Sequence, residues 1–149
     1  MLVKTHVAFG VFATLFFLPH ITYKLVFVPV VLLATLLPDI GQIIPGFRTI
    51  LQTRVARSAV GPHGFLHSYT FCFAVTFLLA WYSPVFSLPF FLGYGIHLLA
   101  DASTPEGIRP FWPSKSVSQG SIRVGGKREQ ALFIAFCLID VALLVGMFV

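Results

Sequence analysis

Five long apolar runs, separated by breaks that mostly carry proline, constrain this chain more than any other feature. A helix needs about 20 residues to cross the hydrocarbon core of a bilayer. The fourth and fifth runs reach that range alone, so we predict an all-α polytopic membrane protein. We expect one domain, residues 1–149, with about five transmembrane or membrane-embedded helices. The runs are 7–18, 25–37, 68–82, 84–100 and 131–149.

The first two runs are short for membrane spans. They become long enough if 2–6 and 21–24 continue their helices, with Lys4 and Lys24 reaching the interface by their long side chains. The alternative is a short helical hairpin that enters only part of the bilayer. Both arrangements return the chain to the same side at Asp39.

Composition excludes an ordinary water-soluble domain. Hydrophobic residues make up 57% of the chain and charged residues 10%, whereas soluble domains carry about 25% charged residues. The net charge of +5 therefore indicates topology and contact with anionic membrane lipid, and we expect no nucleic-acid partner. Cys72 and Cys137 lie inside apolar runs and are interpreted as small hydrophobic residues. The sequence gives no basis for predicting the oligomeric state.

Alternation of the helices divides the basic residues unequally between the two sides. Nine fall on the side of the N-terminus and only Lys24 falls on the other. Basic residues gather in cytoplasmic loops, so we predict a prokaryotic plasma (inner) membrane protein with a cytoplasmic N-terminus. The nine are Lys4, Arg48, Arg54, Arg57, Arg109, Lys115, Arg123, Lys127 and Arg128.

The same side collects nearly all the groups that bind metals. His97 and Asp101 are four residues apart, and His63 and His67 have the same spacing, so each pair shares a face where its segment is helical. Two such pairs can converge on one site from two helices. The candidate metal ligands are His6, Asp39, His63, His67, His97, Asp101 and Glu129.

Imidazole and carboxylate groups together suit a divalent metal, with zinc first and manganese or iron as alternatives. Because several carboxylates are present, the site has enough ligands for more than one ion, and we expect one to three. Polar residues at the end of a helix are expected in any membrane protein, and a lone HxxxH spacing is weak evidence of a metal site. His97 and Asp101 are stronger candidates, because an unpaired ionisable group is costly in so apolar a context. Asp140 is interpreted as a helix–helix hydrogen-bonding residue.

Several short blocks, taken in order, resemble the YdjM-like family of predicted membrane-bound metal-dependent hydrolases. That family is itself distantly similar to the helical zinc-dependent phospholipase C and nuclease group. The blocks are Thr5-His6-Val7, Leu36-Leu37-Pro38-Asp39-Ile40, His63-Gly64-Phe65-Leu66-His67-Ser68, and Gly93 to Asp101 with Thr104-Pro105-Glu106-Gly107 and Trp112-Pro113 behind it.

The resemblance implies a polar core of His6, Asp39, His63, His67, His97 and Asp101, with Glu129 as a weaker ligand. It further implies metal-dependent hydrolysis of a phosphoester or a lipid-headgroup ester at the cytoplasmic face, with catalytic roles for Asp39, His67 and Asp101.

The chain departs from the family pattern at several positions, and two of these departures concern functional groups. Gly41 stands where a second Asp is usual, and Gly64 replaces an Arg. A non-enzymatic scaffold or transporter subunit, with a structural metal site or a hydrogen-bond cluster, therefore remains the alternative function.

Overall fold

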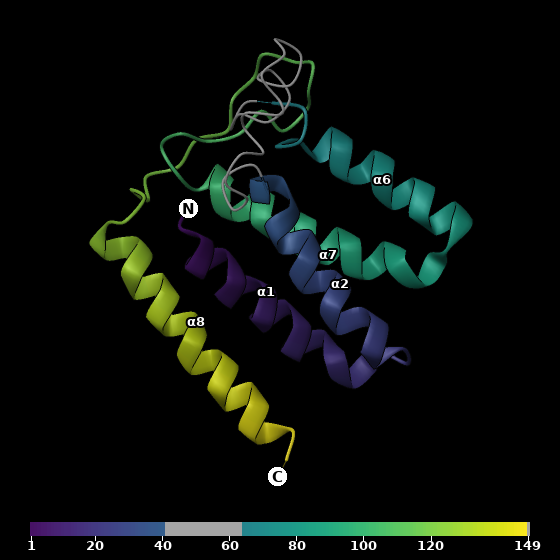
Figure 1. Cartoon of the computed structure of the whole chain (residues 1–149). Coiled ribbons are helices and arrows are strands. Elements are labelled where there is room, and N and C mark those ends of the chain that lie inside the picture. The colour runs from purple at the N-terminus through teal and green to yellow at the C-terminus, as the bar shows by residue number, and fades with distance from the viewer. Residues whose placement is uncertain (41–63, 149) are drawn as a thin grey trace.

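The computed structural model describes residues 1–40 and 64–148, and within them helices are the only regular elements apart from one isolated bridge between Ile108 and Ser118. The predicted all-α class is confirmed, and all five apolar runs form helices (Figure 1). The helices are α1 (Val3–Phe17), α2 (Lys24–Leu36), α6 (Tyr69–Tyr82), α7 (Pro84–Ala102) and α8 (Lys127–Gly146), with short 3-10 turns η1 (Leu18–His20) and η2 (Leu37–Asp39).

Fewer helices are suited to cross a membrane than the sequence predicts. Among the described residues only α7, with 19 residues, and α8, with 20, are long and apolar enough. The other three have 13 to 15 residues, and at 1.5 Å per residue they measure about 20–22 Å against a core of about 30 Å. Two of the five helices are thus suited by length and composition to cross a membrane, fewer than the expected number of about five transmembrane or membrane-embedded helices. The first run does extend towards the N-terminus, to Val3, but in the second only Lys24 is added.

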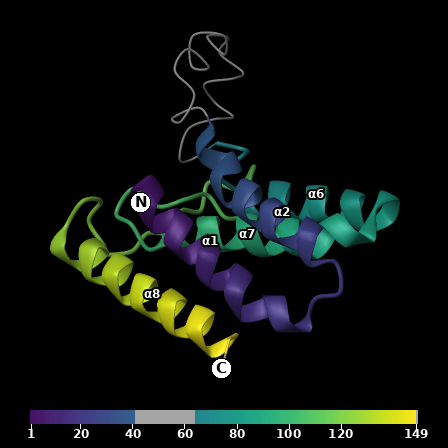
Figure 2. The same cartoon turned by 60° about the horizontal axis from the view of Figure 1, so that its bottom comes forward.

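Helix α7 is the centre of the arrangement. It packs most extensively against α2 on one side and α6 on the other, and α1 lies against both α2 and α7. Helix α8 lies along α1 and has no other extensive helix contact in the described structure (Figures 1 and 2). The N-terminus, the end of α7 and the start of α8 lie at one end of the bundle (Figure 1).

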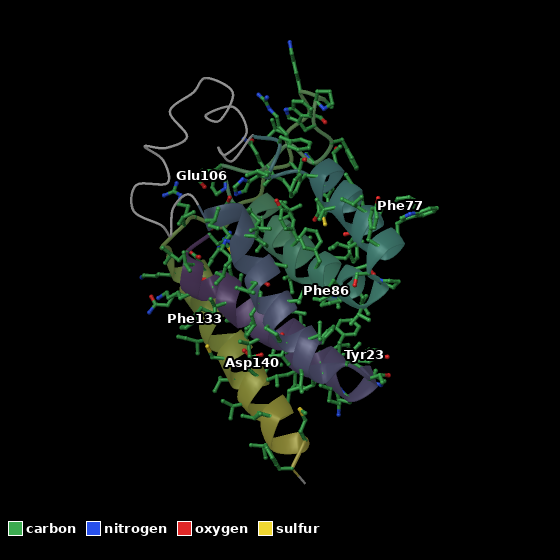
Figure 3. All side chains as sticks on the ribbon, turned by 45° about the vertical axis from the view of Figure 1, so that its right-hand side comes forward. Tyr23, Phe77, Phe86, Glu106, Phe133 and Asp140 are labelled. Carbon is green, nitrogen blue, oxygen red and sulfur yellow. The ribbon has the colours of Figure 1, made fainter. Side chains whose placement is uncertain are left out.

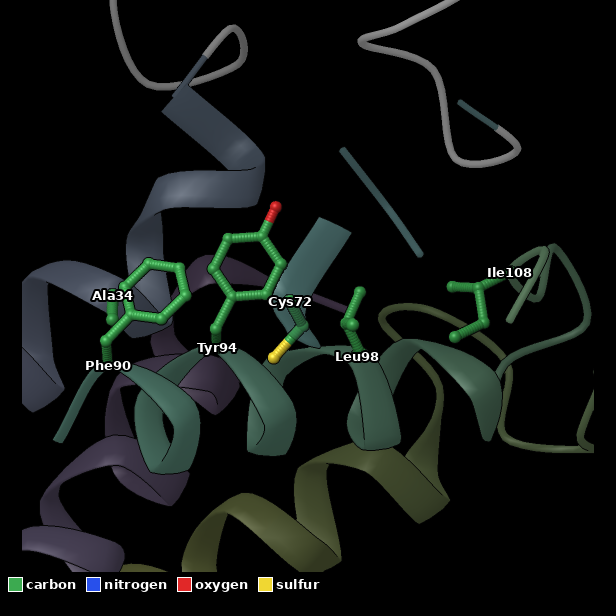
Figure 4. Packing of buried hydrophobic residues seen from close by; sticks show 6 residues of the cluster. All are labelled: Ala34, Cys72, Phe90, Tyr94, Leu98 and Ile108. Atoms are coloured by element: carbon green, nitrogen blue, oxygen red, sulfur yellow. The ribbon is translucent and has the colours of Figure 1, made fainter. Parts of the chain in front are cut away.

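One face of α7 carries the main hydrophobic core. Phe90, Tyr94 and Leu98 recur every four residues, the spacing that places side chains on one helix face, and they pack with Ala34 and Cys72 (Figure 4). The hydroxyl of Tyr94 donates a hydrogen bond to the carbonyl of Leu66. The core therefore also anchors the chain just before α6.

Gly93 permits the close approach of α7 to α2. A Cβ atom at this position would collide with the backbone carbonyl of Val31 and would crowd the side chain of Ala34. Small residues at a helix interface let backbones approach closely. This contact sets the distance between the two helices whose ends carry Asp39 and Asp101.

The long segment after α7 is irregular, as predicted, but it is tied to the end of that helix. The backbone amide of Gly120 donates to the carbonyl of Thr104 at 2.9 Å, and that of Ile122 donates to Ser103 at 3.0 Å. The hydroxyl of Thr104 in turn donates to the carbonyl of Asp101 at 2.7 Å. The segment thus forms a fixed rim around the last turn of α7.

The tight packing at Gly93 predicts that Gly93→Ala destabilises the protein by about 1–3 kcal/mol, the usual cost of overpacking. At Gly95, two residues away on the same helix, an added Cβ atom would meet nothing within 4 Å. Gly95→Ala should be neutral or stabilising, since Ala is the better helix former. Thermal unfolding in detergent micelles compares the two variants, and equal melting temperatures would contradict the packing assignment.

Candidate metal centre

Five of the seven predicted ligands meet at one end of the bundle, although they come from four different segments. His6 lies in α1, Asp39 ends η2, His67 immediately precedes α6, and His97 and Asp101 lie in α7. All five are buried, and the most exposed, Asp101, is 8% accessible. The sequence prediction that these groups share one end is therefore confirmed for the described residues.

Asp101 is the centre of this cluster. One carboxylate oxygen, Oδ1, lies 3.2 Å from Nε2 of His6, and the other, Oδ2, lies 3.2 Å from Nε2 of His97 and 3.9 Å from Nε2 of His67. Asp39 faces the same histidines, with Oδ1 3.5 Å from His67 and Oδ2 3.9 Å from His6. The two carboxylates thus bracket three imidazoles, two of which, His6 and His97, stack at 3.9 Å between ring centroids.

The backbone of α2 fixes the orientation of one imidazole. Nδ1 of His97 lies 2.7 Å from the carbonyl oxygen of Thr35, so Nδ1 carries the hydrogen, because a carbonyl can only accept. In the neutral ring Nε2 then presents a lone pair towards the carboxylate of Asp101. Two acceptors at this distance repel unless a proton or a cation lies between them. Metal-binding histidines use the same backbone or carboxylate support on their second nitrogen.

The donor atoms fit a divalent cation. Asp39, His67, His97 and Asp101 each offer a ligand atom, and these four atoms lie within 4.8 Å of one another. Zinc binds such ligands at about 2.0–2.2 Å, so pairs 3.2–3.9 Å apart suit a shared ion with little movement. Nε2 of His97 and both ring nitrogens of His6 are buried without a well-formed hydrogen bond among the described residues. Buried polar atoms are nearly always satisfied, which favours a cation as the partner.

Asp39 is held in the charged form that metals require. Burial by itself raises the pKa of its carboxyl group, but the hydrogen bond with His67 and the nearby imidazoles of His97 and His6 outweigh burial. The pKa of Asp39 therefore lies below its ordinary value. A carboxylate that is ionised at neutral pH has the charge needed to bind a cation or to accept a proton.

His67 is positioned by a turn and not by a helix. Residues 64–68 form bends and turns, and α6 begins only at Tyr69, where the Ser68 side chain accepts a hydrogen bond from the amide of Phe71 at 3.2 Å. The shared helical face expected for His63 and His67 thus does not apply at His67. His63 lies outside the described residues, as do Gly41, Arg48, Arg54 and Arg57.

Glu129, the seventh predicted ligand, is engaged with backbone and hydroxyl donors. Its Oε1 accepts hydrogen bonds from the amide of Leu2 at 2.6 Å and from the hydroxyl of Thr5 at 2.9 Å, and Oε2 accepts from the amide of Gly125 at 2.6 Å. This carboxylate joins the start of α8 to the start of α1. Its link to the cluster is indirect, because Thr5 is the neighbour of His6 in the chain.

Sequence reasoning missed two groups in the cluster. The amino group of Met1 forms an ion pair with Oδ1 of Asp101 at 2.5 Å, and the carbonyl of Thr35 supports His97. Both groups belong to the backbone, which is the same at every residue, so the sequence does not indicate what they will contact. Only the packing of α1 and α2 against α7 brings them to the site.

A pocket of about 270 Å³ gives access to the cluster in the described structure. Asp39, His67 and Asp101 line it together with Thr104 and the exposed Glu106. Glu106 belongs to the irregular segment that follows α7 (Figure 3). Three of the four residues in the candidate metal group are therefore reachable from this pocket, as a site for chemistry requires.

The comparisons with known proteins place this arrangement in a family. The family described as "YdjM inner membrane protein" matches residues 1–148. The chain is 37% identical over 97 residues to the inner membrane protein YdjM of Escherichia coli K12, covering 59% of this chain and 50% of that protein. The same values hold for the Shigella flexneri protein of that name. The chain thus spans about half the length of these curated relatives. No solved structure matches it.

Metal binding should depend on His97. Outer-shell changes alone weaken metal binding about 10–100-fold, so removal of a ligand by His97→Ala should weaken zinc binding at least that much. His20 is exposed in η1, at the opposite end of α1, and His20→Ala should bind zinc like the wild type. Elemental analysis of purified protein after zinc loading and dialysis measures both. Equal zinc content in the two variants would refute the site.

The role of Glu129 can be separated from ligation. Glu129→Gln keeps the shape but weakens the hydrogen bonds to Leu2 and Gly125, so it should destabilise folding by about 1–3 kcal/mol while zinc content is retained. The same change at exposed Glu106 should alter stability by less than about 0.5 kcal/mol. Thermal unfolding measures the stability of both variants, and elemental analysis measures their zinc content. Loss of zinc at unchanged stability would instead make Glu129 a ligand.

Proposed function

The chain belongs to the YdjM family of inner membrane proteins, and from that premise we propose that it is a membrane-embedded, metal-dependent hydrolase of phosphoesters. The observation that carries the proposal is the buried group of Asp39, His67, His97 and Asp101, which opens to a pocket. A site that serves stability alone needs no such opening. Two imidazoles and two carboxylates favour zinc, with manganese or iron as the alternatives.

The residues divide between holding a cation and moving a proton. His97 and Asp101 would hold the ion, since the Thr35 carbonyl already directs Nε2 of His97 towards the Asp101 carboxylate. A bound divalent metal would supply a Lewis acid that polarises a phosphoryl oxygen and makes water nucleophilic near neutral pH. His67 and Asp39 line the pocket, and either can complete the ligand set. Asp39, kept ionised, is suited to accept the proton of the attacking water.

The surroundings of the site support an anionic substrate at the level of lipid headgroups. Arg109, Lys115, Arg123, Lys127 and Arg128 belong to the segment and helix start that follow α7. Together with the nine-to-one distribution of basic residues in the sequence, they favour a cytoplasmic position for the N-terminus and for the site. Basic groups in that position attract the anionic headgroups of the inner leaflet.

One contact favours the alternative function, a structural hydrogen-bond cluster without catalysis. The Met1 amino group supplies a positive charge to Asp101 at 2.5 Å, which partly neutralises the carboxylates without any metal. Such a cluster would join α1 to α7 and would serve a scaffold or transporter subunit. A protein without bound metal would exclude the hydrolase, whereas bound metal fits both the hydrolase and a structural metal site, so turnover by the zinc-loaded protein decides between the two functions.

Hydrolysis is tested on protein reconstituted in vesicles of phosphatidylethanolamine and phosphatidylglycerol, with release of water-soluble phosphate or headgroup as the readout. Zinc-loaded wild type should be active and a chelator should abolish turnover. Asp39→Asn should lower the rate about 10²–10⁴-fold, the usual effect of losing a general base. Asp140→Asn is the matched control, because Asp140 lies on α8 away from the cluster (Figure 3). A zinc-loaded wild type that releases no product from these lipids or from water-soluble phosphomonoesters would refute the hydrolase.

A further inference from the structure

A second cavity lies beside the polar pocket and has the opposite character. It holds about 350 Å³ and is formed between α1, α7 and α8. Phe9 and Phe12 contribute from α1, Ile96 and Leu99 from α7, and Leu132 and Phe136 from α8. Apart from the Ser103 hydroxyl, every described side chain that lines it is apolar. Its volume falls within the range of pockets that bind small molecules, about 300–1,000 Å³.

The two cavities meet at one residue. Met1 lines the apolar cavity and also lines the polar pocket that contains Asp39, His67 and Asp101. From Ser103 the apolar cavity follows α7 back to Ile96, which at 1.5 Å per residue is about 10 Å. This stretch of α7 also contains His97 and Asp101, so the cavity lies at the level of the polar cluster there. On α1 it extends to Phe12, six residues or about 9 Å beyond His6.

The walls of the cavity are held in place by specific packing. Phe136 of α8 makes edge contacts with Phe9 and Phe12 of α1, with ring centroids 4.3 and 5.1 Å apart. These contacts fix α8 against α1, while α8 has no extensive packing with α7 in the described structure. Leu99, on the α7 wall, is 62% exposed. The apolar cavity is thus a groove with one side open to its surroundings.

We propose that this groove holds one hydrocarbon chain of a membrane lipid whose polar headgroup lies in the pocket over the His/Asp cluster. The proposal rests on the proposed function for the identity of the site, and it names the substrate class as a lipid phosphoester. An apolar groove that shares the Met1 wall with a polar pocket matches a molecule with one apolar and one polar end. Helices α7 and α8, which form two of its walls, are the two described helices that are long and apolar enough to cross a membrane.

A hydrocarbon chain gains little hydrophobic energy by leaving the bilayer, since lipid tails are as apolar as the groove. The groove therefore acts by position: it holds the chain beside α1 and directs the attached headgroup towards Asp101. A water-soluble phosphoester would fill the polar pocket and leave the groove without a role.

The groove is tested with the full chain in vesicles of phosphatidylethanolamine and phosphatidylglycerol that contain a trace of photoreactive phosphatidylglycerol. The photoreactive group is a diazirine in the upper third of one acyl chain, and adducts are mapped by mass spectrometry. We expect about tenfold more adduct at Leu99 and Phe136 than at Leu138, which corresponds to a preference of about 1.4 kcal/mol. Leu138 is 66% exposed on α8 and does not line the groove, so it reports ordinary lipid contact.

A groove-filling variant supplies the second measurement. Leu132→Trp should reduce labelling at Leu99 to the level at Leu138, and Leu138→Trp, the same change on the same helix, should leave labelling at Leu99 as in the wild type. Thermal unfolding of both variants shows whether they are folded. If Leu132→Trp does not fold, the wild-type labelling ratio still decides.

The outcomes separate this proposal from the proposed function. Labelling uses no catalysis, so concentrated adducts with no hydrolysis support the groove and refute the enzyme. Even labelling along the exposed faces of α7 and α8 overturns the groove. A lack of lipid adducts at both Leu99 and Phe136 also overturns it, and would mean that something other than lipid, such as a second copy of the chain, covers the groove. Hydrolysis of water-soluble phosphoesters together with even labelling would keep the enzyme and overturn the lipid substrate.

Discussion

The carboxylate of Asp101 is the point on which the rest of the arrangement depends. A buried carboxylate is costly unless donors or cations surround it, and Asp101 is surrounded on both oxygens, by the Met1 amino group and His6 on one and by His97 and His67 on the other. These partners come from α1, α7 and the segment before α6, so satisfying one carboxylate brings three parts of the chain to the same place. The close grouping of His6, His67, His97 and Asp39 around Asp101 follows from this requirement.

The second constraint is the approach of α2 to α7. Gly93 brings the backbones together, and one turn further along α7 the same contact places the Thr35 carbonyl against His97. The 3-10 turn that follows α2 then delivers Asp39 to the histidines. Packing in the apolar middle of the bundle thus controls the orientation of polar groups at its end, which explains why the site and the core cannot be considered independently.

The helices and the shared end of the ligands were predictable, because apolar runs, prolines and i,i+4 spacing are local signals. His97 and Asp101 lie together on α7 as their spacing predicts. The number of spanning helices was overestimated, since Pro19 and Pro38 mark breaks but give no exact helix length. The contacts of Met1 and Thr35 were not predictable, because they use backbone atoms. Glu129 has the residue type of a ligand, and only the structure shows its hydrogen bonds to Leu2, Thr5 and Gly125.

The separate position of α8 has a consequence for how the protein is made. His6, Asp39, His67, His97 and Asp101 all precede Lys127, where α8 begins, and α8 packs mainly against α1. During synthesis every residue of the polar cluster is therefore made before α8. Helix α8 then packs against α1. The hydrogen bonds of Glu129 to Leu2 and Thr5 join this last helix to α1, the first helix that the structure describes.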